Sequence, residues 1–254
     1  MTNIFAHRGA SITHPENTMT AFQAAVDAGA EGIELDVQLT KDEEVVVIHD
    51  NTVNRTTDGF GAVHELTAKE ISKLDAGSWR DASFRGEKVP LLKDVLEWLT
   101  DKDILINIEL KKHKPGYETL AKKVTDVIKE HNVQKKIILS SFYHSIMVDL
   151  HQNHPDIESA LLVTAGLYDP LSYMKSTGIT SLHANVNTIT VKEMQELQRH
   201  GIKVRVYTVN NPIEIKCCIK AGFDTVMTDD PAAAVKLRNR HLEDKKTTQN
   251  PRDI

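Results

Sequence analysis

The residue types that could do chemistry gather in the first fifty positions of the chain. Glu34 and Asp36 lie in the run Gly-Ile-Glu-Leu-Asp-Val-Gln-Leu (residues 32–39), where apolar and polar side chains alternate. Such alternation is typical of a β-strand, in which every second side chain points to the same face. The two carboxylates are therefore expected to share one face of a strand, opposite its apolar face.

A second strand is expected directly after the first. The polar residues 41–44 separate it from the β-branched run 45–48, and so short a connection allows only an antiparallel hairpin. A turn centred on residues 42 and 43 places Asp36 opposite His49. Because opposed Cβ atoms lie roughly 4.5 to 5.5 Å apart, the hairpin alone brings a histidine beside the two carboxylates.

The rest of the chain alternates expected strands with expected helices. Strands are predicted over residues 3–7, 32–39, 104–110, 136–141, 159–163, 181–184, 204–209 and 225–227. Helices are predicted over residues 18–28, 90–99, 117–131, 143–152, 170–176, 191–200, 212–221 and 231–240. This alternation predicts an α/β fold, a closed (β/α)8 or TIM barrel, with an open parallel sheet as the alternative.

Two segments fall outside the alternation. Residues 51–89 are rich in turn signals such as Thr-Thr-Asp-Gly-Phe-Gly, and we interpret them as a small insertion that caps the site. Residues 243–254 are polar and charged, which is typical of a disordered tail. The prediction is one catalytic barrel domain over residues 1–242, with a β-hairpin extension after the second strand.

In a barrel of this kind the site is built at the carboxyl ends of the strands. Those positions hold three carboxylates, Glu34, Asp36 and Glu109, together with Arg8 and Lys111. Inward carboxylates are costly unless positive charge is bound between them. Hard oxygen ligands favour one divalent cation, Mg²⁺ or Ca²⁺ with Mn²⁺ also suitable, and the two basic side chains suit phosphate oxygens.

Two histidines complete this set. His7 and His49 lie at strand ends and are interpreted as a general acid and base, with the two roles left unassigned. Further strand-end candidates for substrate binding are Phe142, Tyr207 and His183; the two aromatic side chains could equally be pocket walls or core, and His183 could equally be a structural histidine. Glu16 and Asn17 are expected to hold the loop after the first strand, behind the residues that touch substrate, or else to cap its helix.

The ordered motifs resemble those of the glycerophosphodiester phosphodiesterases, of the bacterial cytoplasmic type. They are His7-Arg8-Gly9, Glu16-Asn17-Thr18, Glu34-Leu35-Asp36, His49-Asp50, Glu109-Leu110-Lys111 and Val206-Tyr207-Thr208-Val209-Asn210. The resemblance covers roughly residues 4–235, and one departure is Tyr207, where many members carry Trp. Residues 51–89 are similar to the insertion that separates this family from the phosphatidylinositol phospholipases C.

The resemblance implies an eight-stranded barrel that hydrolyses glycerophosphodiesters such as glycerophosphocholine or glycerophosphoethanolamine to sn-glycerol 3-phosphate and an alcohol. It implies a divalent ion at Glu34, Asp36 and Glu109, an acid/base pair at His7 and His49, and phosphate contacts from Arg8 and Lys111. Water or the substrate's glycerol hydroxyl could be the nucleophile. The alternatives are a phospholipase C- or D-like enzyme on intact lipids and a non-catalytic glycerophosphodiester-binding protein.

Bulk properties limit the partners. The net charge of −5 argues against nucleic acid, whose binding proteins are basic. No run approaches the ~18 apolar residues of a membrane span, so no stable membrane association is expected. Adjacent Cys217 and Cys218 and a start without a signal peptide indicate a cytoplasmic protein. A monomer or homodimer acting on a small-molecule substrate is expected.

Overall fold

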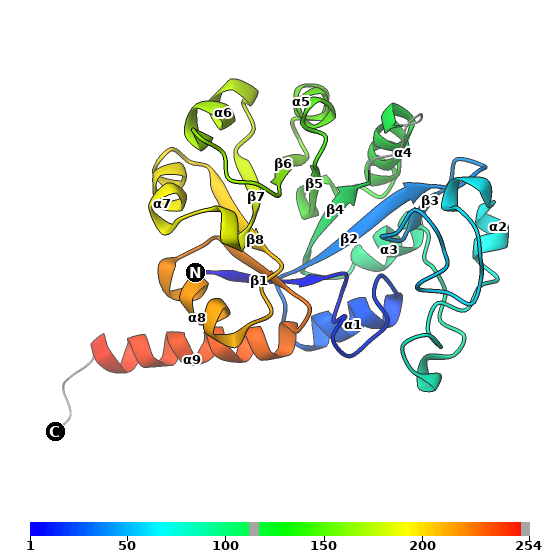
Figure 1. Ribbon diagram of the computed structural model, residues 1–254, viewed down its shortest axis with the longest axis horizontal. Helices are drawn as coiled ribbons and strands as arrows, with labels where there is room; N and C mark the ends of the chain where they lie inside the picture. The colour runs from blue at the N-terminus through cyan, green and yellow to red at the C-terminus, as the bar shows by residue number, and fades with distance from the viewer. Residues whose placement is uncertain (112–116, 250–254) are drawn as a thin grey trace.

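The computed structural model describes residues 1–111 and 117–249, and its strands close into a barrel (Figure 1). The barrel strands are β1 (Asn3–His7), β2 (Gly32–Leu39), β4 (Leu105–Leu110), β5 (Ile137–Ser141), β6 (Glu158–Val163), β7 (Ser181–Asn185), β8 (Lys203–Tyr207) and β9 (Thr225–Thr228). Each pairs in parallel with its two neighbours, and β1 closes the ring by pairing with both β2 and β9. The predicted closed barrel is confirmed, and the open sheet is excluded.

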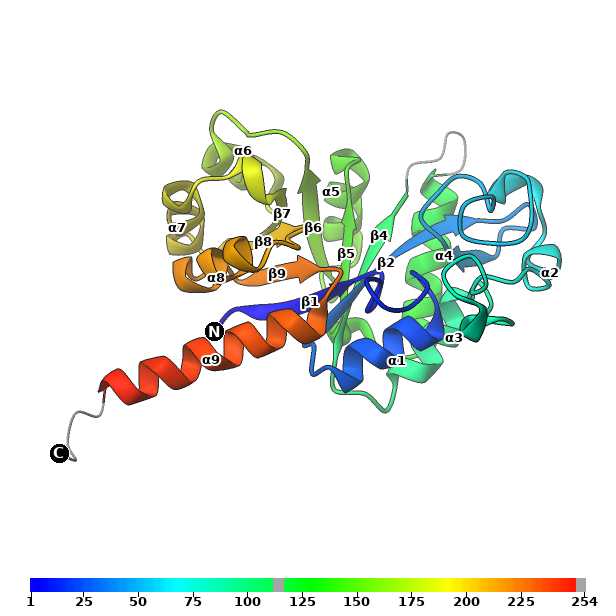
Figure 2. The same ribbon diagram turned by 60° about the horizontal axis from the view of Figure 1, so that its bottom comes forward.

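Helices lie around the outside of the barrel (Figures 1 and 2). They are α1 (Met19–Asp27), α3 (Leu92–Leu99), α4 (Tyr117–Glu130), α5 (His144–Asn153), α6 (Pro170–Thr177), α7 (Val191–Arg199), α8 (Pro212–Ala221) and α9 (Pro231–Gln249), whereas α2 (Ala68–Ile71) lies in the segment 51–89. Short 3-10 turns are η1 (Val63–Glu65), η2 (Ala82–Phe84), η3 (Gln134–Lys136) and η4 (Val186–Thr188). Most of the predicted elements agree with these bounds within two residues.

Local sequence explains where several helices begin. The Thr18 hydroxyl accepts the backbone N–H of Ala21 at the start of α1, and the side chains of Asp169, Thr190 and Asn211 cap α6, α7 and α8 in the same way. Such caps satisfy N–H groups that have no partner inside the helix. Pro90 was expected in the first turn of its helix, but α3 begins only at Leu92.

The last helix is longer than predicted. It continues past Arg240 to Gln249 and extends beyond the edge of the barrel (Figure 2). Residues 243–249, expected in a disordered tail, are therefore helical in the structure. The segment carries neither Gly nor Pro before Pro251, so nothing in its sequence stops the helix at residue 240. Residues 250–254 of the expected tail lie outside the described residues.

The hairpin forms with a register one residue from the predicted one. β3 (Val45–Val47) pairs antiparallel with β2, and Ile48, rather than His49, lies beside Asp36 and donates its N–H to the Asp36 carbonyl at 2.9 Å. The turn is one residue longer than expected because Glu43 adopts a left-handed conformation, with φ of 58°. The Thr40 hydroxyl also accepts a backbone N–H across this turn at 3.0 Å.

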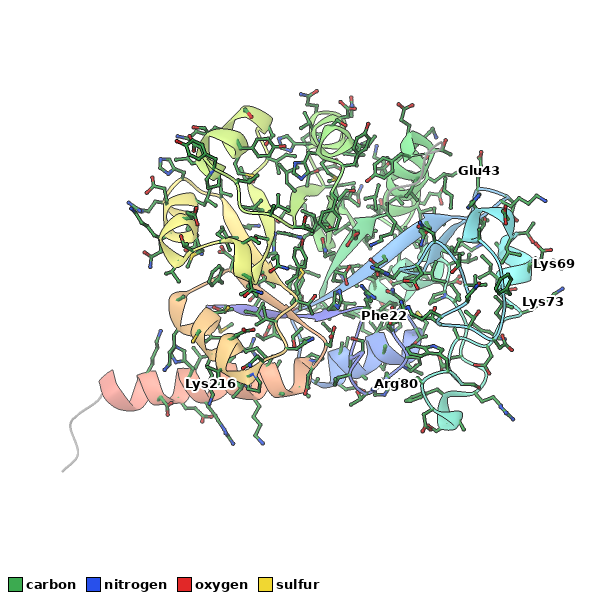
Figure 3. All side chains as sticks on the ribbon, in the orientation of Figure 1. Phe22, Glu43, Lys69, Lys73, Arg80 and Lys216 are labelled. Atoms are coloured by element: carbon green, nitrogen blue, oxygen red, sulfur yellow. The ribbon has the colours of Figure 1, made fainter. Side chains whose placement is uncertain are left out.

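Residues 51–89 form a folded unit around an apolar core that is separate from the core between the barrel and its helices. That core joins the outer face of the hairpin to the insertion through Val46, Ile48, Val53, Val63, Ile71, Ala76 and Val89. Lys69 and Lys73 project from the outer edge of this unit, away from the barrel (Figure 3). Because the core lies on the hairpin that follows β2, the insertion is fixed next to the end of the strand that carries Glu34 and Asp36.

The barrel interior is filled by a compact layer of side chains. Phe5, Ile138, Ala160 and Met227 are fully buried there and contact one another. Gly32 of β2 lies against the Phe5 ring, and a Cβ at this position would be 2.3 Å from the ring. The glycine therefore leaves the space that Phe5 fills beneath the site.

We predict that Gly32→Ala destabilises the protein by about 1 to 3 kcal/mol, because the added methyl group overpacks the interior. Urea unfolding measures the change in the free energy of unfolding. The control is the same substitution in a Phe5→Leu background, where the ring is gone and the cost of Gly32→Ala should shrink. Equal costs in both backgrounds would contradict this packing account.

Candidate active site

The loop after β1 has an unusual backbone that aims Arg8 into the barrel mouth. Arg8 and Asn17 are non-glycine residues with positive φ, 58° and 56°, a conformation that costs free energy and is common at functional sites. Gly9 has φ of 83°, and a Cβ there would lie 2.7 Å from the Ala21 backbone. Close packing of this loop on α1 thus requires glycine after Arg8.

Three carboxylates meet at the barrel mouth, as predicted, and we call them the acidic cluster: Glu34, Asp36 and Glu109. One oxygen from each lies within 4.8 Å of the others. The register explains the meeting, because β2 and β4 pair with Asp36 beside Glu109, and Glu34 faces the same side two residues earlier. Glu34 and Asp36 are buried. An all-oxygen set this compact suits a hard divalent cation.

Two cations partly balance the acidic cluster. The Nε of Arg8 lies 3.3 Å and the Nζ of Lys111 3.4 Å from Asp36 carboxylate oxygens. Lys111 also donates to Glu109 at 2.8 Å, and the Asn17 amide donates to Asp36 at 2.9 Å. Asp36 is thus the carboxylate at the centre of the site, contacted from both the β1 loop and β4.

Within the described part of the chain, the acidic cluster remains short of positive charge. Burial, together with the Asp36 charge, raises the pKa of Glu34 to about 8, and the same two causes raise the pKa of Glu109. Burial alone would raise the pKa of Asp36, but Lys111 and Arg8 outweigh it and lower that pKa. Among the residues that the structure describes, two cations therefore do not compensate three carboxylates, and a bound divalent cation would complete the balance.

Each predicted histidine is held by an aspartate. His7 Nδ1 donates to Asp229 at 2.7 Å, and its Nε2 lies 3.9 Å from Glu34. His49 Nδ1 donates to Asp50 at 2.7 Å. Because a carboxylate engages Nδ1 in both rings, Nε2 is the nitrogen that each presents for proton transfer.

The two histidines have opposite pKa shifts. Burial alone would lower the pKa of His7, but the hydrogen bond to Asp229 and the charge of Glu34 outweigh it and raise the pKa. Burial lowers the pKa of His49, with Arg8 adding to the effect against the attraction of Asp36. A raised and a lowered pKa suit an acid and a base respectively.

The remaining predicted residues divide into two groups. Tyr207 donates its hydroxyl to the Val163 carbonyl at 2.8 Å, and its ring meets the half-exposed Phe142 edge to face. These two rings can form a pocket wall. His183 is fully buried one layer deeper, in register with Arg205, whose Nη1 lies 3.3 Å from its Nε2. A substrate contact by His183 stays a prediction, and this position does not favour it.

Asp229 and Arg55 are two site residues for which the sequence predicted no role. Asp229 directly follows β9, at a strand end, but its partner His7 is 222 positions away in the chain. Ser11 and Asn210 also donate to Asp229, at 3.2 and 2.5 Å. Arg55 lies in the insertion, where no periodic pattern marked it. Glu16 accepts hydrogen bonds from both Arg8 and Arg55, so it supports the site rather than capping α1.

The sequence matches known proteins along nearly its whole length. A model of the glycerophosphoryl diester phosphodiesterase family matches residues 7–233. A glycerophosphodiester phosphodiesterase of Caldanaerobacter subterraneus subsp. tengcongensis is 42% identical over 236 residues, 93% of this chain and 97% of that protein. One from Bacillus altitudinis is 38% identical over 241 residues, 94% of this chain and 98% of that protein.

Solved structures show the same fold. A phosphodiesterase of Oleispira antarctica, in complex with the product sn-glycerol-3-phosphate, superposes with a TM-score of 0.88 at 27% identity, covering 94% of this chain and 97% of that one. The glycerophosphodiester phosphodiesterase of Thermotoga maritima gives a TM-score of 0.78 at 29% identity, covering 94% and 99%. These matches and the site geometry agree: the chain belongs to the glycerophosphoryl diester phosphodiesterase family.

Proposed function

We propose that this protein hydrolyses glycerophosphodiesters such as glycerophosphocholine to sn-glycerol 3-phosphate and an alcohol, using a divalent cation and two histidines. The observation that carries the proposal is the placement of two aspartate-held histidines beside the acidic cluster and its two cations. The Oleispira antarctica relative was solved with sn-glycerol-3-phosphate as its product, which supports the same product here.

Glu34, Asp36 and Glu109 would hold the cation, and the fit is supported by the raised pKa values of the two glutamates. A divalent cation in this position supplies Lewis-acid stabilisation of the negative charge on phosphate oxygens. Arg8 and Lys111 lie beside the same carboxylates. Their side chains can therefore bind the non-bridging phosphate oxygens and hold the diester against the histidines.

Each histidine carries out one of the two proton transfers. His7, whose pKa is raised, is assigned as the acid that protonates the leaving alcohol. His49, whose pKa is lowered, is assigned as the base that takes a proton from water or from the glycerol hydroxyl. Acid and base each contribute about 10² to 10⁴-fold to the rate. The rest of the barrier reduction comes from charge stabilisation around the phosphate.

We predict that His7→Ala and His49→Ala each reduce turnover of glycerophosphocholine by at least about 10²-fold, because each removes one proton transfer. Release of sn-glycerol 3-phosphate measures the rate, and His200→Ala, on the exposed end of α7, is the matched control. Near wild-type rates in both variants would contradict the mechanism. Substrate binding without turnover by the wild type would instead support the binding-protein alternative.

Asp229→Asn should keep the shape of the His7 partner but remove its charge. The imidazolium form of His7 then loses stabilisation and its pKa falls, so the alkaline limb of the pH–rate profile shifts to lower pH. We also expect kcat to fall about 10 to 100-fold because the ring is held less firmly. Asp101→Asn, exposed in the α3–β4 loop, is the control. An unshifted alkaline limb would remove His7 from the role of acid.

Cation binding should be linked to pH through the acidic cluster. A carboxyl whose folded pKa is raised binds more protons in the folded than in the unfolded state, so it lowers stability as pH rises from its ordinary pKa of 4.5 to about 8. A bound cation relieves this cost. The increase in Tm caused by Mg²⁺ or Ca²⁺ should therefore be larger at pH 8 than at pH 5.

The matched variant is Glu34→Gln, which removes the group with the raised pKa. Scanning fluorimetry in EDTA and with added cation measures Tm for both proteins at each pH. We expect the pH-dependent part of the cation response to shrink in the variant. An identical response in both proteins would place the cation elsewhere.

One observation favours a second candidate, an enzyme that acts on phosphodiesters carrying an acyl chain. Large apolar side chains are exposed in loops or helix starts that follow barrel strands, namely Ile12, Tyr143, Tyr168 and Ile213. An apolar rim can contact a lipid chain or a lipid surface. None of the described helices has the length and apolar character to cross a membrane. Comparing kcat/KM for glycerophosphocholine and lysophosphatidylcholine separates the two candidates.

A further inference from the structure

Arg55 links two carboxylates that lie on different loops. Its guanidinium donates to both oxygens of Glu16, at 2.7 and 2.9 Å, and to both oxygens of Asp50, at 2.7 and 3.0 Å. Glu16 belongs to the loop after β1 and Asp50 follows the hairpin. One side chain of the insertion therefore fixes the distance between two segments that frame the barrel mouth.

Each of these carboxylates holds a residue of the active site. Glu16 accepts a hydrogen bond from Arg8 at 2.8 Å, and Arg8 lies against Asp36 of the acidic cluster. Asp50 accepts from His49 Nδ1 at 2.7 Å. A continuous chain of hydrogen bonds thus runs from Arg8 through Glu16, Arg55 and Asp50 to His49.

The chemistry of this link requires arginine. The planar guanidinium can engage two carboxylates through two pairs of N–H groups, whereas a lysine ammonium acts as a point charge. Without the guanidinium, Glu16 and Asp50 would face each other as two carboxylates. The hydrogen bonds from Arg55 are the largest of the causes that lower the pKa of Asp50, and they also help to lower the pKa of Glu16 against burial.

We propose that Arg55 is a positioning residue that sets Arg8 and His49 at the correct separation for one phosphodiester. It acts through Glu16 on the phosphate-binding side and through Asp50 on the proton-transfer side. The insertion is then a part of the active site's support as well as a cover. This inference rests on the proposed function, and its test includes a measurement that needs no substrate.

We expect Arg55→Gln to lower kcat/KM for glycerophosphocholine by about 10 to 100-fold, with KM raised and kcat lowered together, because misplaced groups lose transition-state contacts. Arg55→Lys should recover only part of this loss. Glu16→Gln should act mainly on KM and Asp50→Asn mainly on kcat. Arg85→Gln, an exposed arginine of the same insertion, is the matched control and should behave like the wild type.

A mutant cycle between Arg55 and the pair Glu16 and Asp50 tests whether Arg55 acts through these two partners. In a background carrying both Glu16→Gln and Asp50→Asn, the further loss caused by Arg55→Gln should disappear. Additive losses, or wild-type kinetics in Arg55→Gln, would overturn the proposal.

Amide hydrogen exchange gives the substrate-free measurement. Arg55→Gln should speed exchange in residues 8–17 and 49–55, while Arg85→Gln should leave both segments unchanged. Unchanged exchange in Arg55→Gln would overturn the positioning role even if the wild type turns over substrate. If Arg55→Gln exchanges faster but the wild type hydrolyses no glycerophosphodiester, the proposed function is overturned and the positioning role of Arg55 is supported.

Discussion

Repulsion among three carboxylates is the constraint around which the barrel mouth is built. Two like charges about 5 Å apart repel by roughly 3 kcal/mol at an effective dielectric constant of 20. Glu34, Asp36 and Glu109 are held at such separations by the pairing of β2 with β4. The fold cannot move them apart without breaking that register, so the surroundings must supply positive charge.

The neighbouring elements place positive charge beside these carboxylates. The loop after β1 accepts a left-handed Arg8 and packs Gly9 against α1, which brings one cation to Asp36. Lys111, directly after β4 and two residues after Glu109, brings the second cation. Both cations lower the pKa of Asp36, whereas the pKa values of the two glutamates stay raised. Among the described residues positive charge is still missing, which is the reason to expect a divalent cation, and the histidines lie beside that position.

Much of this could be predicted from sequence because it depends on period and order. Side chains two apart on a strand share a face, which placed Glu34 with Asp36 and Glu109 with Lys111, and strands alternating with helices predicted the barrel. The register of the hairpin could not be predicted from the sequence, because it depends on the left-handed conformation of Glu43. The contacts of Asp229 with His7 and of Arg55 with Glu16 could not be predicted either. They form only when closure of the barrel and folding of the insertion bring distant segments together.

The most direct test of the account is whether catalysis depends on a cation in the acidic cluster. Release of sn-glycerol 3-phosphate from glycerophosphocholine is measured for the purified protein after EDTA treatment and again after return of Mg²⁺ or Ca²⁺, with one bound cation per chain counted by calorimetry. The account predicts that EDTA abolishes release, that the cation restores it, and that Asp36→Asn loses both binding and release. Full activity in EDTA, with no cation bound, would contradict it.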